Sequence, residues 1–295
     1  MKSVMYHYIR DYNKNYPYFN YLSRENFVSQ IKKFNKKGII NDIEDIKNCR
    51  KKFLLTFDDG LKDHIFAAEE LSKIGCKGIF FISTYPLQSN KILDVHKAHL
   101  ILGKLGGKLP LRKLKEYLKK KNIKNFINFK ESKKFSSPYK HQKDEKEKKE
   151  FKKIINYCGD LKLRSDILDF LLNFFKIKVS VKDFYLTKDE INYISNLGMI
   201  IGSHSEKHNL LSRLTIKEQS KEIKNSKQFI ENITKKKCNF FCFPYGGKYS
   251  YNKHTLRLLR KNKYDYSFSV KNSNITKREI EKFKFELPRF DCNKF

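Results

Sequence analysis

The chain has 295 residues, of which 39% are hydrophobic and 33% charged, a composition typical of a globular protein and not of a disordered one. Its 64 basic and 32 acidic residues give a net charge of +32, which attracts nucleic acids, anionic lipid headgroups or acidic glycans without choosing among them. No apolar run approaches the roughly 20 residues of a membrane span. Residues 1–19 lack the apolar core of a signal peptide, so we expect a cytoplasmic protein.

The first predicted structural unit surrounds a pair of aspartates. The apolar run FLLTF at 53–57 ends in Asp58, Asp59 and Gly60, and a helical pattern follows that closes at Gly75. A second apolar run, GIFFIS, comes next. Strand, acidic loop, helix and strand form one βαβ unit, in which handedness rules favour parallel pairing of the strands.

The same alternation returns in the last third of the chain. The apolar run GMIIGS leads into His204, and residues 215–233 are typical of an amphipathic helix that begins with a capping box of Thr215 and Glu218. The run NFFCFPYGG, a helical pattern at 253–262 and the strand-like YDYSFSV follow. Alternating units of this kind predict an α/β barrel or an open α/β sheet.

Residues 86–190 differ from the two blocks that flank them. Leucines and lysines recur there at helical spacing with few strand signals, so we predict a mostly helical, lysine-rich insertion within a single domain of residues 1–295. Residues 128–153 lack apolar periodicity, which predicts a solvated loop or mobile arm.

Three polar segments stand at the ends of apolar runs: LTFDDG at 55–60, GSHSEKH at 202–208 and FPYGG at 243–247. In parallel α/β folds the carboxyl ends of the strands face the active site, so these segments can converge. His204 and His208 differ by four, which predicts that both imidazoles lie on one face of a helical turn. An aspartate and two such histidines can hold a divalent ion with positions left for water and substrate.

In order and in local sequence, these segments resemble the motifs of the polysaccharide deacetylases of the NodB-homology type, carbohydrate esterase family four. LTFDDG resembles the first motif, HSEKH the second motif, H-[S/T]-x-x-H, and CFPYGG the third. The resemblance covers about residues 1–84 and 190–290. It implies a distorted (β/α) barrel of about seven parallel strands, similar to a TIM barrel. It also implies a metal-dependent hydrolase that removes acetyl groups, N-acetyl before O-acetyl, from a sugar.

The resemblance assigns roles to individual residues. Asp59, His204 and His208 would be the ligands of a divalent metal ion, with zinc as the expected ion, and Asp58 would be the catalytic base. The backbone N–H of Tyr245 would stabilise the oxyanion.

Three further residues are candidates for substrate binding. Pro244 and Gly246 belong to the segment that resembles the third motif. His96, at the start of the insertion, either reaches the substrate or packs within the insertion.

The sequence departs from the commonest family pattern in two places. No histidine follows His254 to act as the general acid, but VMYH at 4–7 resembles a segment of a circularly permuted branch similar to the poly-N-acetylglucosamine deacetylases. His7 is therefore the predicted acid, and the alternative is a core histidine on the first strand. Cys242 stands where many members have an arginine that pairs with the catalytic aspartate, and we expect Arg289, in ELPRF, to take that place.

Two functions follow from these patterns. The first is a deacetylase in glycan or surface-polysaccharide biosynthesis that acts on a lipid- or nucleotide-linked sugar. The alternative is a catalytically impaired glycan-binding protein on the same fold, suggested by Cys242 and the relocated acid. The basic insertion has no nucleic-acid-binding motif, so we expect no specific nucleic acid partner. A peripheral contact with anionic membrane and a merely solvated face both stay open for it.

Overall fold

The computed structural model describes residues 1–40, 42, 44–123, 126–127 and 144–295, which form two compact units. The first unit comprises Met1–Asp11, Tyr21–Lys91 and Val181–Phe295, and the second comprises Tyr12–Asn20 and Ile92–Ser180. The helical segment predicted at 86–190 thus forms most of a unit of its own. Residues 12–20 also belong to that unit, which the sequence did not indicate.

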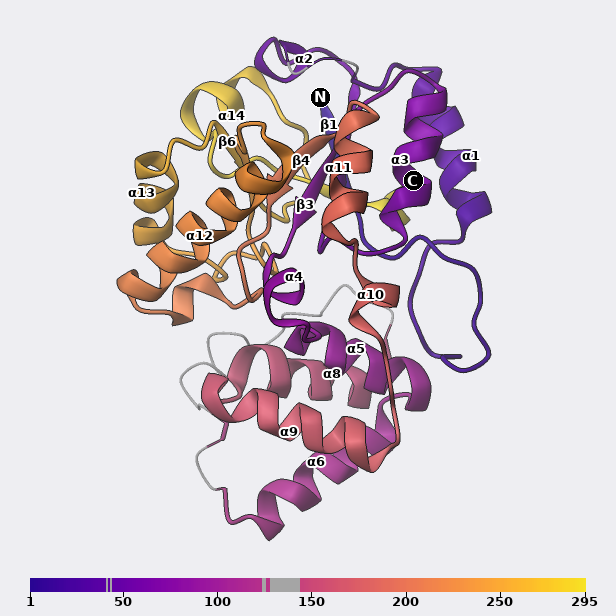
Figure 1. The fold of residues 1–295 in the computed structure, drawn as a ribbon, viewed down its shortest axis with the longest axis vertical. Coiled ribbons are helices and arrows are strands. Elements are labelled where there is room, and N and C mark those ends of the chain that lie inside the picture. Colours follow the sequence, from indigo (N-terminus) through magenta and orange to yellow (C-terminus); the bar gives the residue numbers. More distant parts are fainter. Residues whose placement is uncertain (41, 43, 124–125, 128–143) are drawn as a thin grey trace. The chain divides into compact units, whose positions relative to one another are not determined.

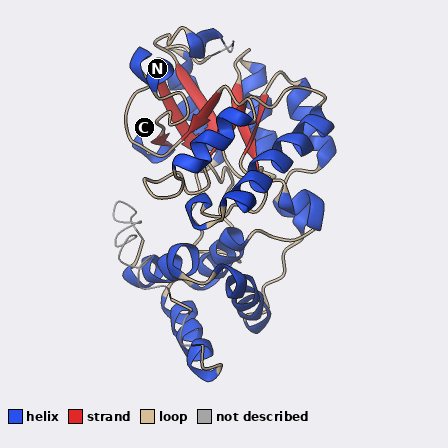
Figure 2. Cartoon of the chain, turned by 90° about the vertical axis from the view of Figure 1, so that its left-hand side faces the viewer, coloured by secondary structure: helices blue, strands red, loops and turns tan. Residues whose placement is uncertain are grey.

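Seven parallel strands form the sheet of the first unit (Figures 1 and 2). Their order across the sheet is β6 (Tyr266–Phe268), β5 (Phe240–Cys242), β4 (Ile200–Ser203), β3 (Gly78–Ile82), β2 (Phe53–Phe57), β1 (Lys2–Tyr6) and β7 (Phe290–Asp291). This curled parallel sheet confirms the predicted distorted (β/α) barrel.

The residues of the two central strands show that the middle of the sheet is buried on both faces. β2 and β3 are continuous apolar runs, FLLTF and GIFFI, in which every residue is buried. Parallel sheets covered by helices on both sides have such strands. The rings of Phe57 and Phe80 stack at 4.4 Å between centroids, so neighbouring strands are joined by packing as well as by hydrogen bonds.

Helices connect and cover these strands (Figure 1). They are α1 (Arg24–Asn35), α2 (Glu44–Lys47), α3 (His64–Lys73), α4 (Tyr85–Ser89), α10 (Val181–Phe184), α11 (Lys188–Asn196), α12 (Ile216–Thr234), α13 (Lys253–Lys261) and α14 (Lys277–Lys282). The helices predicted from the periodicity after β2, β4 and β5 are confirmed as α3, α12 and α13. α12 begins with the predicted capping box, because Thr215 and Glu218 each bond to the other's backbone N–H.

The segment after β6 connects the two outer strands of the sheet. Leu287 pairs with Phe268 of β6, whereas Phe290 pairs with Val4 of β1. The chain therefore passes from one edge of the sheet to the other within a few residues. Arg289 lies between the two pairings and is 1% exposed.

The second unit is helical. Its helices are α5 (Asp94–Leu105), α6 (Lys108–Lys120), α8 (Lys146–Lys153) and α9 (Leu161–Phe174), with a π-helical turn at Ile154–Cys158. The loop predicted at 128–153 is wrong for α8, because Phe151 is buried and anchors a helix of otherwise polar residues. Residues 128–143 lie outside the described residues. Among the described helices, none has both the length and the hydrophobicity that a membrane span requires.

Candidate active site

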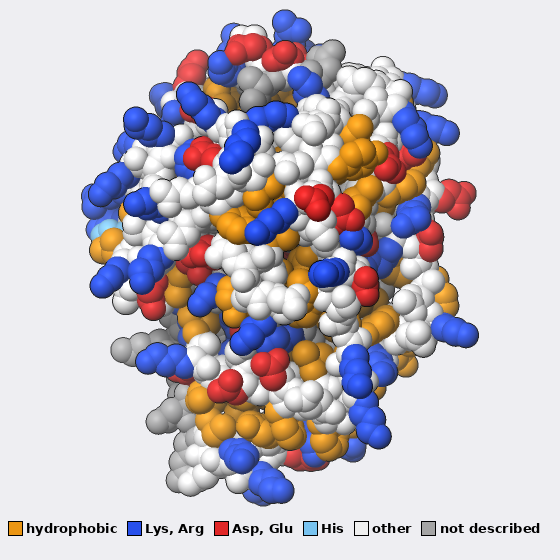
Figure 3. Space-filling view, in the orientation of Figure 1, with side chains coloured by type: hydrophobic (Ala, Val, Ile, Leu, Met, Phe, Trp, Pro, Cys, Tyr) orange, Lys and Arg blue, Asp and Glu red, His pale blue; other side chains and the backbone are white. Residues whose placement is uncertain are grey.

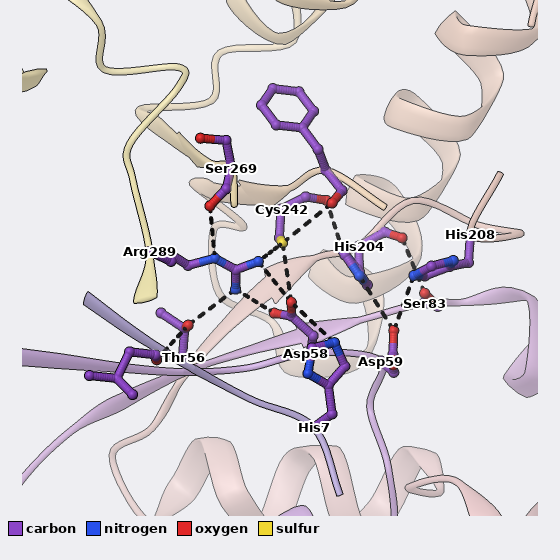
Figure 4. Close-up of polar contacts among 12 residues, drawn as sticks. His7, Thr56, Asp58, Asp59, Ser83, His204, His208, Cys242, Ser269 and Arg289 are labelled. Carbon is purple, nitrogen blue, oxygen red and sulfur yellow. Dashed lines mark hydrogen bonds and ion pairs between the residues drawn. The ribbon is translucent and has the colours of Figure 1, made fainter. Parts of the chain in front are cut away.

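Two aspartates come directly after β2 and face different neighbours (Figure 4). Asp58 and Asp59 are each 2% exposed. Asp59 has a left-handed φ of +82°, so the chain turns sharply at this residue. The Asp58 carboxylate points toward Arg289, and the Asp59 carboxylate points toward His204 and His208.

Both histidines of the second motif lie close to the carboxylate of Asp59. Nε2 of His204 lies 3.4 Å and Nε2 of His208 lies 3.3 Å from Oδ1 of Asp59. The prediction that they share a face of a helical turn is wrong. They lie in an irregular loop after β4, because Ser205 and His208 have left-handed φ values of +63° and +55° that interrupt any helix.

The donor atoms of these three residues fit a divalent metal ion. Ligands about 2.0–2.1 Å from a tetrahedral ion are about 3.3 Å apart, which matches the separations around Asp59 Oδ1. Nδ1 of His204 lies 2.8 Å from the carbonyl oxygen of Cys242. A carbonyl only accepts hydrogen bonds, so Nδ1 carries a proton, and Nε2, on the side of Asp59, is the nitrogen that would bind a metal ion. This orientation is typical of metal-binding histidines.

Helix α12 holds the histidine loop in place. Oε2 of Glu222 accepts hydrogen bonds from the backbone N–H groups of Glu206 and Lys207, both at 2.9 Å. Within the loop, Oγ of Ser205 accepts from the N–H of His208 at 3.2 Å. The sequence analysis did not single out Glu222. A glutamate on the buried face of an amphipathic helix is the signal that could have found it.

Asp58 forms a buried, bidentate ion pair with Arg289. Nη1 of Arg289 donates to Oδ1 at 2.7 Å, and Nη2 donates to Oδ2 at 2.8 Å. Nη1 also donates to Oγ1 of Thr56 at 3.1 Å. Burial alone would raise the pKa of Asp58, but the positive charge of Arg289, together with His204 and His7, outweighs burial and lowers this pKa to about 2. Asp58 is therefore ionised near neutral pH.

Cys242 lies beside this ion pair. Its Sγ is 3.0 Å from Nη2 of Arg289 and 3.6 Å from Oδ2 of Asp58. Burial raises the pKa of the Cys242 thiol, so it is neutral there. Asp58, His204 and Cys242 also bring potential metal-binding atoms together. The guanidinium next to two of these atoms opposes a second cation, so Asp59, His204 and His208 remain the candidate metal ligands.

His7 follows β1 and lies at the edge of the site (Figure 4). Its Nε2 is 3.8 Å from Oδ2 of Asp58, and its side chain is 37% exposed. This exposure argues against a core histidine, since the ring can exchange protons with solvent.

The third motif forms the loop after β5. Tyr245 has a left-handed φ of +63°, and its ring packs edge-on against His208 with 4.8 Å between centroids. Pro244 is buried beside it. Gly246 has a φ of +59°, and a Cβ there would lie 2.6 Å from Val270, so a side chain would not fit. The loop lies beside the candidate metal ligands, while the roles of Tyr245, Pro244 and Gly246 in catalysis and substrate binding stay predictions.

His96 belongs to the second unit and is fully buried on α5. Its ring lies 5.8 Å from that of His99. Contact of His96 with a substrate stays a prediction.

Comparisons with known proteins agree with the motifs and the fold. A family model described as polysaccharide deacetylase matches residues 168–267. No curated protein matches the sequence. Among solved structures, the Streptococcus pyogenes deacetylase PplD in complex with acetate has a TM-score of 0.59 and 14% identity, over 99% of this chain and 91% of that chain.

Two further solved structures are similar over nearly the whole chain. IcaB from Ammonifex degensii has a TM-score of 0.55 and 13% identity, over 98% of this chain and 89% of that chain. The BpsB deacetylase domain from Bordetella bronchiseptica has a TM-score of 0.56 and 12% identity, over 98% and 94%. At these identities the likeness shows the fold alone. The family-model match covers the second and third motifs, so this part of the chain is similar to the polysaccharide deacetylases, and the shared fold agrees with that similarity.

Proposed function

We propose that this protein is a metal-dependent deacetylase that hydrolyses an N-acetyl group of a sugar. The match to the polysaccharide deacetylase family model supports deacetylation of a polysaccharide, and we propose the metal dependence and the N-acetyl group in addition. The main support for the proposal is that a set of potential metal ligands and an ionised carboxylate lie next to each other at one edge of the sheet. Asp59, His204 and His208 offer metal-binding atoms, and the ionised Asp58 lies next to them.

Zinc suits an aspartate and two histidines, and when bound it would polarise the acetyl carbonyl and acidify a water molecule. Asp58, held ionised by Arg289, accepts a proton from the water that attacks the carbonyl carbon.

The remaining steps use groups around Asp58. As the C–N bond breaks and acetate forms, the leaving amine nitrogen needs a proton. His7, near Asp58 and open to solvent, supplies it. The backbone N–H of Tyr245, in the loop that packs against His208, donates to the oxyanion that forms on the carbonyl oxygen.

We further propose that the sugar is linked to a lipid or nucleotide carrier, and that the enzyme works in glycan biosynthesis in the cytoplasm. The charge of +32 supports an anionic substrate, because phosphates on such a carrier would be attracted. On the face drawn in Figure 3, Lys and Arg side chains are scattered and do not gather in one patch. This distribution favours general attraction to an anionic carrier or membrane surface over a specific nucleic acid groove.

The alternative of a glycan-binding protein without turnover rested on Cys242 and on the relocated acid. Arg289 pairs with Asp58 even though Cys242 replaces the arginine expected in the third motif. His7 lies close to the same carboxylate. Both positions support catalysis, so the alternative has no observation in its favour.

The decisive experiment is calorimetry of zinc binding to metal-stripped protein. We expect about one tight ion per chain in the parent, and loss of binding in Asp59→Ala and in His204→Ala. His254→Ala, on α13, is the matched histidine control and should bind zinc like the parent. Absence of specific binding in the parent would contradict the metal-dependent mechanism.

Turnover is measured as acetate released from N-acetylglucosamine oligomers and from a nucleotide-linked N-acetylglucosamine. Zinc-loaded parent should release acetate from at least one of these, and Asp58→Asn should not, while still binding zinc. Equal acetate release by Asp58→Asn and the parent would remove Asp58 from the mechanism.

A further inference from the structure

We propose that Asp63 and His64, at the start of α3, are positioning residues that hold His7 in place beside Asp58. The proposal rests on the proposed function, in which His7 is the general acid. Neither side chain contacts the predicted metal ligands in any described hydrogen bond, so both would act through His7.

His64 is buried in an apolar environment and contacts the backbone of His7. Its Nε2 lies 3.0 Å from the carbonyl oxygen of His7. Its ring lies against those of Phe57 and Phe80, with 5.6 and 5.8 Å between centroids. Burial lowers the pKa of His64 to about 4, so the ring is neutral, and because a carbonyl only accepts, Nε2 carries the proton.

The position of His64 is costly for the fold. Nδ1 of the same ring is buried and has no hydrogen-bond partner among the described residues. A buried polar atom without a partner destabilises the protein, so an apolar side chain would suit a pocket of phenylalanines better. What the imidazole adds there is the hydrogen bond to His7.

Asp63 fixes the residues that follow His7. Oδ2 of Asp63 accepts from the backbone N–H of Ile9 at 3.1 Å and from Nε of Arg10 at 2.7 Å. Oδ1 accepts from Nη2 of Arg10 at 2.9 Å. The guanidinium of Arg10 also lies over the ring of Tyr8, 4.6 Å from its centroid. Two adjacent residues thus contact the backbone at His7 and Ile9 and the side chain of Arg10.

This arrangement matters because the His7 ring itself is held only loosely by its contact with Asp58. The ring is partly exposed, and its contact with Asp58 is 3.8 Å long. Asp58 and Asp63 belong to the same short segment between β2 and α3. A displacement of about 1 Å at a proton donor can lower turnover by about 100-fold.

The first test reads the position of His7 without any substrate. The protein is labelled with 13C-histidine, loaded with zinc and studied by NMR, and the ring signal of His7 is assigned by its loss in His7→Gln. We expect His64→Phe, which removes the N–H donor, to shift and broaden this signal while those of His204 and His208 stay in place. His64→Gln, which keeps an N–H donor, should shift it less.

His254→Gln on α13 is the matched control, and it should leave the His7 signal unchanged. If His64→Phe does not fold, Arg10→Gln tests the same clamp at a partly exposed position. A His7 signal that changes no more in the folded clamp variant than in His254→Gln would overturn the proposal.

The second test uses acetate release from the N-acetylglucosamine tetramer. We expect His64→Phe to lower kcat by about 10- to 100-fold with a small change in KM, and to cause no further loss in a His7→Ala background. An equal loss in both backgrounds would mean that His64 acts only on the fold. If the parent does not hydrolyse the tetramer, the proposed function or this probe has failed, and the NMR signal of His7 alone decides the positioning role.

Discussion

Replacing Arg289 by methionine tests the electrostatic basis of the site. The change removes one partner of an ion pair in which both side chains are almost fully buried. Removing one member of such a pair costs about 3–5 kcal/mol, because the other charge is left buried. The lowering of the Asp58 pKa from its ordinary 3.8 to about 2 corresponds to about 2 kcal/mol at neutral pH, which sets a lower bound.

The pH dependence of this loss identifies its cause. In the parent, the contribution of Asp58 is present above pH 3.8 and is lost as the pH falls toward 2. In Arg289→Met, burial raises the Asp58 pKa above 3.8, so the variant loses stability as the pH rises through that value. The difference in unfolding free energy between parent and variant should therefore be smaller at pH 3 than at pH 7.

Urea unfolding followed by circular dichroism at both pH values measures this difference. Arg24→Met is the matched control, because its pair with Asp11 is 3.9 Å long and exposed. That control should cost less than about 1 kcal/mol. A loss in Arg289→Met that is equal at both pH values would refute the reasoning, since it would come from packing alone.

Three other changes test separate parts of the site. Glu222→Ala should lower zinc affinity by about 10- to 100-fold in calorimetry, because the histidine loop loses its support, and unchanged affinity would contradict this. His7→Ala should lower turnover by about 10²- to 10⁴-fold with zinc affinity unchanged, and a loss below threefold would exclude His7 as the acid. Thr215→Ala should cost about 1 kcal/mol of unfolding free energy by removing the cap of α12, and a cost near zero would show that this cap is dispensable.

Much of the first unit could be predicted from local patterns. β2 and β3 are short apolar runs, and α12 combines helical periodicity with a capping box, so each is determined by neighbouring residues. The convergence of Asp59, His204 and His208 also followed, because parallel strands present their carboxyl ends at one edge. The backbone of the histidine loop did not follow, since Ser205 adopts a left-handed φ that spacing does not reveal.

Other features depend on contacts between distant residues. β7 is only two residues long, and no run of apolar residues marks it. Phe151 anchors α8, although the segment around it has the composition of a loop. The hydrogen bond from His64 to His7 joins residues that are 57 positions apart in the sequence, and neither a motif nor periodicity predicts it.

The ion pair of Asp58 and Arg289 also has a consequence for how the protein is made. The two residues are 231 positions apart, so all the residues between them must be synthesised before the pair can form. Such long-range contacts form late, since the closure of a long loop must first be compensated. An incomplete chain on the ribosome would hold Asp58 without its counter-ion. The active site is therefore completed only after the rest of the sheet has been synthesised, and truncated chains should be inactive.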